Sequence, residues 1–331
     1  MTIESSEGHH LEEIRAVPLR HPGRWVATAA LLVLAAMLGH SMFTNPHWGW
    51  GIIRSNLFSP PIVQGVEKTI ELTLISMLVG VVLGVLCAVM RLSPNPILSG
   101  TAWTYIWLFR GTPVYVQLLF WYAISYLFPV ISLGIPFGPS FVHLNANTLI
   151  TPLVAAVLGL GLNEGAYYAE IVRAGILSVD HGQFEAAQSL GMRRVTLMRR
   201  IVLPQAMRVI VPPTGNEVNN MLKTTSLAVV VTYPELLYQT SNDIARTYIT
   251  VPFYINACIW YLFMTTLLTI IQFYVERYYA RGTARALPLT PFQRLRQDLF
   301  RIRPQPTPSQ GEAPWMELPP PPPPPHHEEA R

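Results

Sequence analysis

The chain has 331 residues, of which 50% are hydrophobic and only 13% are charged, with a formal net charge of +4. Its apolar residues come in several near-continuous runs of membrane length, which a soluble enzyme of this size would not need, so that class is excluded. The basic residues are spread over the connections between these runs without interleaved aromatic residues, which excludes nucleic acid as the reason for the positive charge.

Runs of about 20 apolar residues predict six membrane-spanning segments. In chain order they are Val26–Phe43, Val66–Met90, Pro113–Val130, Thr148–Val172, Val209–Val231 and Pro252–Tyr274. The mostly polar stretch before the first run is too long a lead for a secretory signal, so this run is predicted to be a retained helix.

The basic residues, almost all of them arginines, predict the orientation of the spans. With the N-terminus in the cytoplasm, the outside connections hold only Arg54, Lys68 and Arg246. The inside connections hold Arg15, Arg20, Arg24, Arg91, Arg110, Arg193, Arg194, Arg199, Arg200, Arg277, Arg281 and Arg285. This bias predicts a multi-pass protein with both termini in the cytoplasm.

Two pairs of glycines with GxxxG spacing lie in the second and fourth runs. They are Gly80 with Gly84, and Gly161 with Gly165. Close packing between helices is the expected role of both pairs, and gating flexibility is the alternative.

Ionisable residues inside the apolar runs are informative, because an unpaired charge near the bilayer centre costs at least about 2.5 kcal/mol. They are Glu71, Glu164, Glu170, Glu217 and Lys223. Each should face a neighbouring helix or a wet cavity, and for this set both a transport lining and structural pairing remain open. Lys223 does not share a helical face with Glu217, so it is expected to meet a carboxylate on another helix.

Glu164 is the preferred candidate for contact with a transported solute, because further polar residues follow it on the same and on the next span. The predicted path consists of Asn163, Glu164, Tyr167, Tyr168, Asn216, Glu217, Asn220 and Lys223. Such a path suits a zwitterion, whose ammonium and carboxylate groups need replacements for the water they lose.

The segment FEAAQSLGMRRVTLMRRIVLP, residues 184–204, lies between the fourth and fifth runs. Ala186 and Ala187 favour a helix that another surface can approach closely, and Gly191 ends that helix or permits a sharp turn. The four arginines of the following helical stretch stay in water or at lipid headgroups, and Pro204 begins the next helix. A small helical knob is predicted, with an ordinary basic amphipathic loop as the alternative.

The spacing of this segment resembles the EAA loop of ABC-importer permeases, E-A-A-x3-G-x9-I-x-L-P. Its fixed positions are filled by Glu185, Ala186, Ala187, Gly191, Ile201, Leu203 and Pro204. The resemblance implies a coupling helix that sits in a groove of a cytoplasmic ATPase subunit and passes the ATPase's closing motion to the membrane helices. Glu185 would fix the loop or pair with a basic ATPase residue, and the two alanines and the glycine would be the close-packing positions.

From about Gly65 to Tyr279 the chain is similar to the polar amino acid branch of these permeases, the histidine/glutamine type. The motifs that carry the likeness are TIELT from Thr69, RGTP from Arg110, AYYAEIVR from Ala166, Gly182-Gln183, PQA from Pro204, Pro212-Pro213, Asn216 and KTTSL from Lys223. Thr224 departs from the family, in which an acidic residue is common within the last motif.

The resemblance implies an all-α, polytopic membrane protein with a five-helix type I ABC-importer permease core and one extra N-terminal transmembrane helix. The implied parts are a cytoplasmic N-terminal segment (1–25), the extra helix (26–43), the permease domain (64–280) with its coupling loop (176–204), and a basic, Pro-rich cytoplasmic tail (281–331). The tail is expected to be a largely disordered linker with local polyproline II structure, or alternatively a docking peptide.

The expected function is that of a permease subunit of the bacterial inner membrane, which imports polar amino acids by alternating access. The implied partners are a second permease subunit, a cytoplasmic ABC ATPase dimer, a periplasmic amino-acid-binding protein and membrane lipid. No G-x-x-x-x-G-K-[ST] sequence occurs, so ATP and Mg²⁺ are expected on the partner ATPase. This chain is expected to hold no cofactor, metal or catalytic residue.

Three alternatives compete with this expectation. A secondary transporter driven by an ion gradient would need neither the EAA spacing nor an ATPase. A membrane-embedded enzyme would need a nucleophile with a base, or a metal cluster. An importer of the same kind for a related solute, such as an opine or an ectoine-like compound, would use a similar scaffold.

Overall fold

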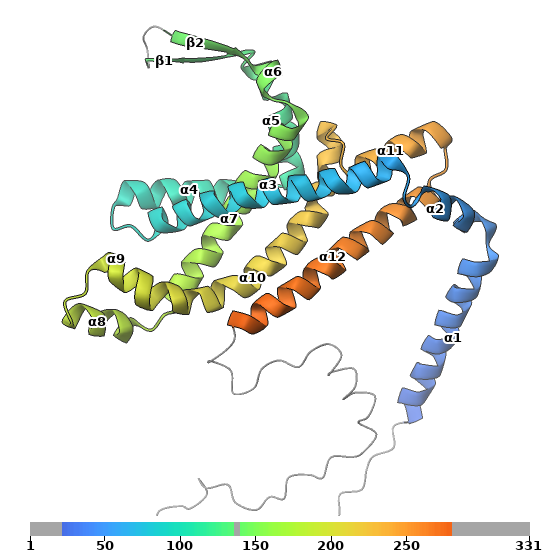
Figure 1. Cartoon of the computed structure of the whole chain (residues 1–331), viewed down its shortest axis with the longest axis horizontal. Helices are drawn as coiled ribbons and strands as arrows, with labels where there is room; N and C mark the ends of the chain where they lie inside the picture. The colour runs from blue at the N-terminus through green and yellow to red at the C-terminus, as the bar shows by residue number, and fades with distance from the viewer. Residues whose placement is uncertain (1–21, 136–139, 280–331) are drawn as a thin grey trace, which may run out of the picture. The chain divides into compact units, whose positions relative to one another are not determined.

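The computed structural model describes residues 22–135 and 140–279. Most of the expected N-terminal segment (1–25) and the whole Pro-rich tail (281–331) lie outside the described residues. The described part is almost entirely helical and includes one short β-hairpin (Figure 1).

The helices and turns occur in the following order, with the hairpin between α5 and α6. They are α1 (Pro22–Thr44), the 3-10 turn η1 (Pro46–Trp48), α2 (Trp50–Asn56), α3 (Pro60–Arg91), α4 (Pro96–Gly111), α5 (Val114–Leu127), α6 (Ala146–Leu149), α7 (Pro152–Leu177), α8 (His181–Ser189), α9 (Arg194–Leu197), the π-helical turn η2 (Met198–Val202), α10 (Leu203–Thr224), the 3-10 turn η3 (Thr225–Val231), α11 (Leu236–Thr247) and α12 (Val251–Tyr279).

Local sequence signals explain where several of these helices begin. Prolines stand in the first turn of α3, α4, α7 and α10, where the missing N–H costs no hydrogen bond. The side-chain oxygens of Asn95 and Thr151 accept hydrogen bonds from the backbone N–H groups of Ile97 and Val154, and so cap α4 and α7.

Among the described residues, three helices are long and apolar enough to cross a membrane, namely α1, α3 and α12. The shorter helix α5 is also apolar. Helices α7 and α10 have 26 and 22 residues and carry most of the polar residues that the sequence predicted for a transport path. Each predicted run therefore overlaps a helix, but α7 and α10 are not among the described helices that are long and apolar enough to cross a membrane.

Helix α4 was not predicted, and it contains Arg110 in its last turn. The sequence reading put this residue in a cytoplasmic connection, whereas α4 fills that connection and packs against α3 and α7. Arg110 ends α4 with its guanidinium 5.0 Å from the ring centroid of Tyr167 in α7. The guanidinium of Arg110 therefore makes a cation–π contact with the ring of Tyr167.

A polar contact holds the break between α4 and α5. The side chain of Gln117 is buried, and its Nε2 donates to the carbonyl of Phe109 at 2.9 Å and to the hydroxyl of Thr112 at 2.8 Å. The first of these bonds satisfies the carbonyl of Phe109, which would otherwise accept from the N–H of residue 113, because proline lacks an N–H. The third predicted run thus begins at the break after α4 and contains the second of the two helices, α5.

The hairpin departs from a purely helical expectation. Strands β1 (Val130–Gly134) and β2 (Ser140–Asn145) are antiparallel, with Ile131 opposite Leu144 and Ser132 opposite His143. The register shifts between Leu133 and Gly134. The third run was predicted to continue to Val130, but α5 ends at Leu127, just before a proline.

The centre of the fold is the packing of α3 against α7, which uses both glycine pairs (Figure 1). A Cβ at Gly84 would lie 2.7 Å from the Cβ of Tyr168, and one at Gly161 would lie 2.9 Å from Val79. These distances leave no room for a side chain, so the predicted close packing of the GxxxG pairs is confirmed.

The fifth predicted run, Val209–Val231, is not one helix. It begins inside α10, which contains Pro212 and Pro213, and it ends in the 3-10 turn η3. Helix α11 then leads to α12, which lies beside α10 (Figure 1).

Candidate functional site

The segment 184–204 begins inside α8 and contains a sharp turn. Asp180 caps α8, because its Oδ1 accepts a hydrogen bond of 2.6 Å from the N–H of Gly182. At the other end, the N–H of Gly191 donates to the carbonyl of Gln188 at 2.9 Å and the N–H of Met192 donates to that of Ala187 at 3.1 Å. This pair of bonds is the Schellman motif, which needs a left-handed residue, and Gly191 has φ +68°. The spacing between Ala187 and Gly191 in the motif therefore matches the C-terminal end of a helix.

The inner side of α8 packs onto the chain's own helices. Ala187 is only 2% exposed. It belongs to a buried cluster with Leu197, Val202, Ala88 of α3 and Val172 of α7. Ala187 was expected to be a close-packing position toward the ATPase. In the structure it packs against this cluster of the chain's own residues.

The outer side of α8 carries the remaining residues of the motif. Glu185, Ala186 and Gly191 are exposed. Glu185 Oε1 lies 3.1 Å from Nδ1 of His181, one turn earlier on the same surface. A Cβ added at Gly191 would meet nothing within 4 Å. The exposed side of α8 thus combines small residues with polar ones, among them the carboxylate of Glu185.

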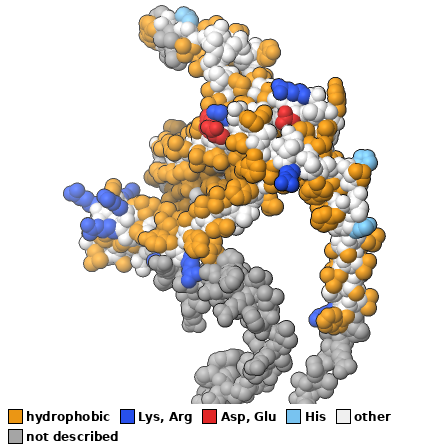
Figure 2. Space-filling model, turned by 45° about the vertical axis from the view of Figure 1, so that its right-hand side comes forward, with side chains coloured by type: hydrophobic (Ala, Val, Ile, Leu, Met, Phe, Trp, Pro, Cys, Tyr) orange, Lys and Arg blue, Asp and Glu red, His pale blue; other side chains and the backbone are white. Residues whose placement is uncertain are grey.

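Two exposed apolar residues beside this surface were not predicted. Leu190 is 82% exposed and Val195 is 77% exposed. The four arginines nearby, Arg193, Arg194, Arg199 and Arg200, are exposed as well, and basic side chains gather at this end of the molecule (Figure 2). Leu190 directly precedes the turn glycine Gly191, and this position could have indicated an exposed apolar residue from the sequence alone.

The end of the motif leads into α10. Ile201 is partly buried and packs against the cluster around Ala187, in the π-helical turn η2. Leu203 is 39% exposed and begins α10, where Pro204 occupies the first turn as predicted. The motif therefore runs without interruption from the exposed helix α8 to the start of the long helix α10.

A polar cleft of about 530 Å³ lies between α7 and α10. Its lining residues are Val114, Leu160, Asn163, Glu164, Tyr167, Glu217, Asn220, Met221, Lys223 and Thr224. Six of the eight residues predicted for a transport path are among them, although they come from two helices far apart in the sequence.

Glu164 is the most buried polar group of this cleft, with 6% of its surface exposed. Its Oε1 has no hydrogen-bond partner among the described residues. The neighbouring Asn163 is held in place, because its Nδ2 donates to the carbonyl of Phe109 at 2.9 Å. A buried carboxylate oxygen without a partner is costly, so this position is suited to a ligand that donates hydrogen bonds.

The structure separates the five ionisable residues of the apolar runs into two groups. Glu71 pairs with Lys68, and Glu170 pairs with Arg173 at 2.7 Å, each on its own helix. Glu164, Glu217 and Lys223 instead line the cleft.

Lys223 was expected to meet a carboxylate on another helix. Among the described residues it makes no ion pair and its side chain is exposed, so the described part of this chain does not supply the expected carboxylate. It lies where the cleft meets a second one of about 570 Å³ between α10 and α12. That second cleft is lined by Asn216, Asn219, Asn220, Lys223, Thr265, Thr269, Gln272, Phe273 and Glu276.

Gln272 of α12 was not predicted, yet it organises the second cleft. Its Nε2 donates to Asn216 Oδ1 at 3.0 Å and to Glu276 Oε1 at 2.7 Å, and its Oε1 accepts from Asn219 at 2.9 Å. Asn216 therefore faces α12 and not the cleft that holds Glu164.

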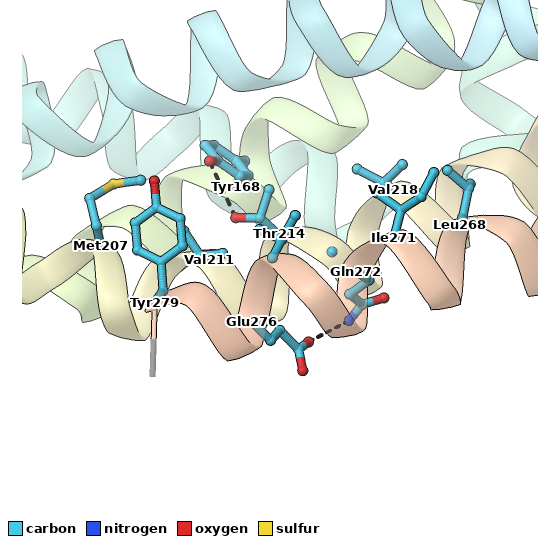
Figure 3. A pocket seen from close by; sticks show the side chains of 12 residues that line it. Tyr168, Met207, Val211, Thr214, Val218, Leu268, Ile271, Gln272, Glu276 and Tyr279 are labelled. Carbon is cyan, nitrogen blue, oxygen red and sulfur yellow. Dashed lines mark hydrogen bonds between the residues drawn. The ribbon is translucent and has the colours of Figure 1, made fainter. Parts of the chain in front are cut away.

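Tyr168 also lies apart from the cleft around Glu164. It lines a largely apolar groove of about 330 Å³ between α10 and α12, where its hydroxyl is 3.3 Å from that of Thr214 (Figure 3). Tyr167 lines the cleft around Glu164, whereas Tyr168, the next residue of α7, does not. The prediction that both tyrosines line one path was wrong for Tyr168.

Comparison with known proteins gives a match over most of the described chain. Residues 80–281 match the family described as "Binding-protein-dependent transport system inner membrane component". The arginine transport system permease protein of Corynebacterium glutamicum is 49% identical over 276 residues, which cover 83% of this chain and 85% of that protein. The nopaline transport system permease protein of Agrobacterium fabrum is 39% identical and covers 62% of this chain and 82% of that protein.

Solved structures agree with the sequence comparison. The chain resembles one in the crystal structure of an amino acid ABC transporter with histidines, with 35% identity and a TM-score of 0.56. The match covers 67% of this chain and 95% of that one. An inward-facing methionine ABC transporter gives a TM-score of 0.54 at 18% identity, which is a likeness of fold alone.

Proposed function

The chain belongs to the family of binding-protein-dependent transport system inner membrane components, and on that premise we propose that it moves polar amino acids through the cleft between α7 and α10. It is a multi-pass permease subunit of an amino acid ABC importer, and a gradient-driven transporter is not favoured. Polar amino acids are the proposed solutes, because the relatives are named for arginine and nopaline.

The observation that carries the proposed solute path is the buried, unpartnered oxygen of Glu164. Glu217 lines the same cleft, so two carboxylates can receive the ammonium group of an amino acid. Lys223, at the lip of the cleft, can receive its carboxylate. Asn163, Tyr167 and Asn220 supply neutral hydrogen-bonding groups for the rest of the solute.

Partner subunits complete the proposed transporter. The ATP-hydrolysing subunits, with their ATP and Mg²⁺, are separate cytoplasmic chains, and a periplasmic binding protein delivers the solute. A second permease subunit, identical or related, lies beside this one. Both termini and α8 face the cytoplasm, in agreement with the arginine bias of the connections.

Coupling to the ATPase proceeds through α8. The exposed side with Glu185, Ala186 and Leu190 is the proposed docking surface, because small residues allow a partner backbone to come close. The buried cluster around Ala187 then links α8 to α3, α7 and α10. Since packed interiors transmit strain rather than absorb it, a push on α8 would shift the ends of these helices together.

The test is ATP-dependent uptake in proteoliposomes that contain the permease, its ATPase and its binding protein. In Ala186→Trp we expect a chain that inserts normally but neither retains the ATPase during purification nor takes up solute. Ala123→Trp, on the exposed side of α5, is the matched control and should behave like the wild type. Full uptake by Ala186→Trp would contradict docking at α8.

A further inference from the structure

We propose that the hairpin β1–β2, together with the end of α5, lies in the interfacial layer of the bilayer with one of its faces against lipid. The partner is thus a lipid surface, and the proposal requires only that the chain is embedded in a membrane. It does not depend on which solute is transported.

The first support is the absence of charge. No Asp, Glu, Lys or Arg occurs between Arg110 and Glu164, and His143 is the one hairpin side chain that can become charged near neutral pH. Figure 2 shows this projecting end in apolar and uncharged polar colours with a histidine. A surface that binds a soluble protein transiently is exposed to water whenever that protein is absent, and such binding sites have polar rims. An uncharged surface suits permanent contact with lipid.

The second support is the exposed apolar surface that continues from α5. Tyr126 is 88% exposed, Leu127 64% and Phe128 58%, and on β2 Phe141 is 68% exposed. Aromatic side chains gather at membrane–water interfaces, where their rings meet the headgroup region. The apolar helix α5 ends where this aromatic group begins.

The third support is the difference between the two faces of the hairpin. Opposite residues share a face, so the register places Ile131 with Leu144 on one face and Ser132 with His143 on the other. The polar face is organised by hydrogen bonds, because His143 Nδ1 lies 3.0 Å from the hydroxyl of Ser132 and its Nε2 lies 3.2 Å from that of Ser140.

Backbone chemistry sets the depth. A two-stranded hairpin leaves the outward N–H and C=O groups of both strands without partners inside the hairpin, which the hydrocarbon core does not tolerate. In water alone such a hairpin is marginally stable. The N–H of Ala146 donates to the carbonyl of Pro129 at 2.9 Å and closes the hairpin at its base. The interface supplies both polar groups for the edges and an apolar layer for one face.

The experiment uses spin labels on single cysteines in the full importer, reconstituted in nanodiscs, after replacement of Cys87 and Cys258 by alanine. Labels at Leu144→Cys and Ser132→Cys report on the two faces, through their accessibility to oxygen and to a water-soluble nickel chelate. Ala123→Cys on α5 is the lipid reference, and Ala245→Cys on the exposed side of α11 is the water reference.

We expect the ratio of oxygen to nickel accessibility at position 144 to be several-fold above that at position 132 and close to that at 123. Equal ratios near the value at 245 would overturn the proposal. So would nickel protection at 144 that appears only after the binding protein is added, since that result would identify a protein partner. Should Leu144→Cys disturb the hairpin, Phe128→Cys repeats the measurement at its base, with the same outcomes.

Discussion

The backbone of Gly80 in α3 lies directly against the side chain of Glu164 in α7. A Cβ at position 80 would be 2.5 Å from Cγ of Glu164 and 2.7 Å from its Cβ. The same contact buries the carboxylate that we assign to the solute path. The packing of α3 against α7 and the position of Glu164, the candidate solute-binding residue, therefore both depend on Gly80.

Gly80→Ala should separate α3 from α7 and destabilise the protein by about 1–3 kcal/mol, because the added methyl group overpacks a tight contact. The matched control is Gly100→Ala in α4, where a Cβ would meet nothing within 4 Å. That control should be neutral or gain up to about 1 kcal/mol, because alanine favours helices. Thermal unfolding in detergent measures both, and equal stability of the two variants would contradict the contact.

Gly191→Ala should weaken coupling through backbone strain. Its φ of +68° costs a residue with a Cβ about 1–2 kcal/mol, although the space around it is open. Gly191→Asn should be milder, because asparagine enters the left-handed region more easily, and Gly191→Asp adds a charge to the docking surface. The measurement is uptake per ATP hydrolysed in proteoliposomes. If alanine and asparagine were equally harmful, the strain account would be wrong.

Glu164→Gln should lower uptake at least about tenfold, because a hydrogen bond to a charged group contributes roughly 1.5–3 kcal/mol. Glu170→Gln on the same helix is the control. Glu170 pairs with Arg173 near the surface, and such pairs contribute about 1 kcal/mol or less. The affinity of the binding protein for the solute should be unchanged in both. Similar uptake in the two variants would remove Glu164 from the path.

The buried carboxyl group of Glu235 should make the free energy of unfolding depend on pH. It lies between α10 and α12, is fully buried, and caps α11 by accepting from the N–H of Leu237 at 2.8 Å and of Tyr238 at 2.7 Å. Its Oε2 also accepts a hydrogen bond of 2.8 Å from the hydroxyl of Tyr261. Burial raises the pKa of this carboxyl from 4.5 to about 7, against the opposing effect of these hydrogen bonds.

A carboxyl group with a raised pKa favours the folded state where it is protonated. The contribution is therefore complete below pH 4.5 and is lost as the pH rises through 7, by about 3 kcal/mol in total. The melting temperature of the wild type, relative to that of Glu235→Gln, should rise as the pH falls from 8 to 5. A constant difference between the two proteins over this range would show that the pKa is not raised.

Much of the site could be predicted from local sequence. The EAA spacing indicated a helix, a glycine turn and a helix start at Pro204, and α8, Gly191 and α10 occupy those places. The GxxxG pairs indicated close packing, and α3 packs against α7 through them. These features depend on hydrogen bonds and steric limits within a few residues, so the sequence carries them directly.

Other features were missed because they depend on residues far apart in the chain. The apolar length criterion passed over α4, which packs against two other helices. Tyr168 was grouped with Tyr167, but the rotation of α7 turns it toward α10 and α12. Gln272 and Glu276 were not considered, since only the neighbouring α10 makes them part of a cleft.

The sequence by itself determined, through the length of its apolar runs, that this is a helical membrane protein, and the spacing of its EAA segment gave the resemblance to permeases. It also indicated where that segment forms a helix and turns, because glycine position and capping are local properties. Only the tertiary structure decided which polar residues share a cleft, which ion pairs stay on one helix, and that Ala187 faces inward. Those outcomes depend on how each helix is rotated against its neighbours, and that rotation is set by packing among residues distant in the chain.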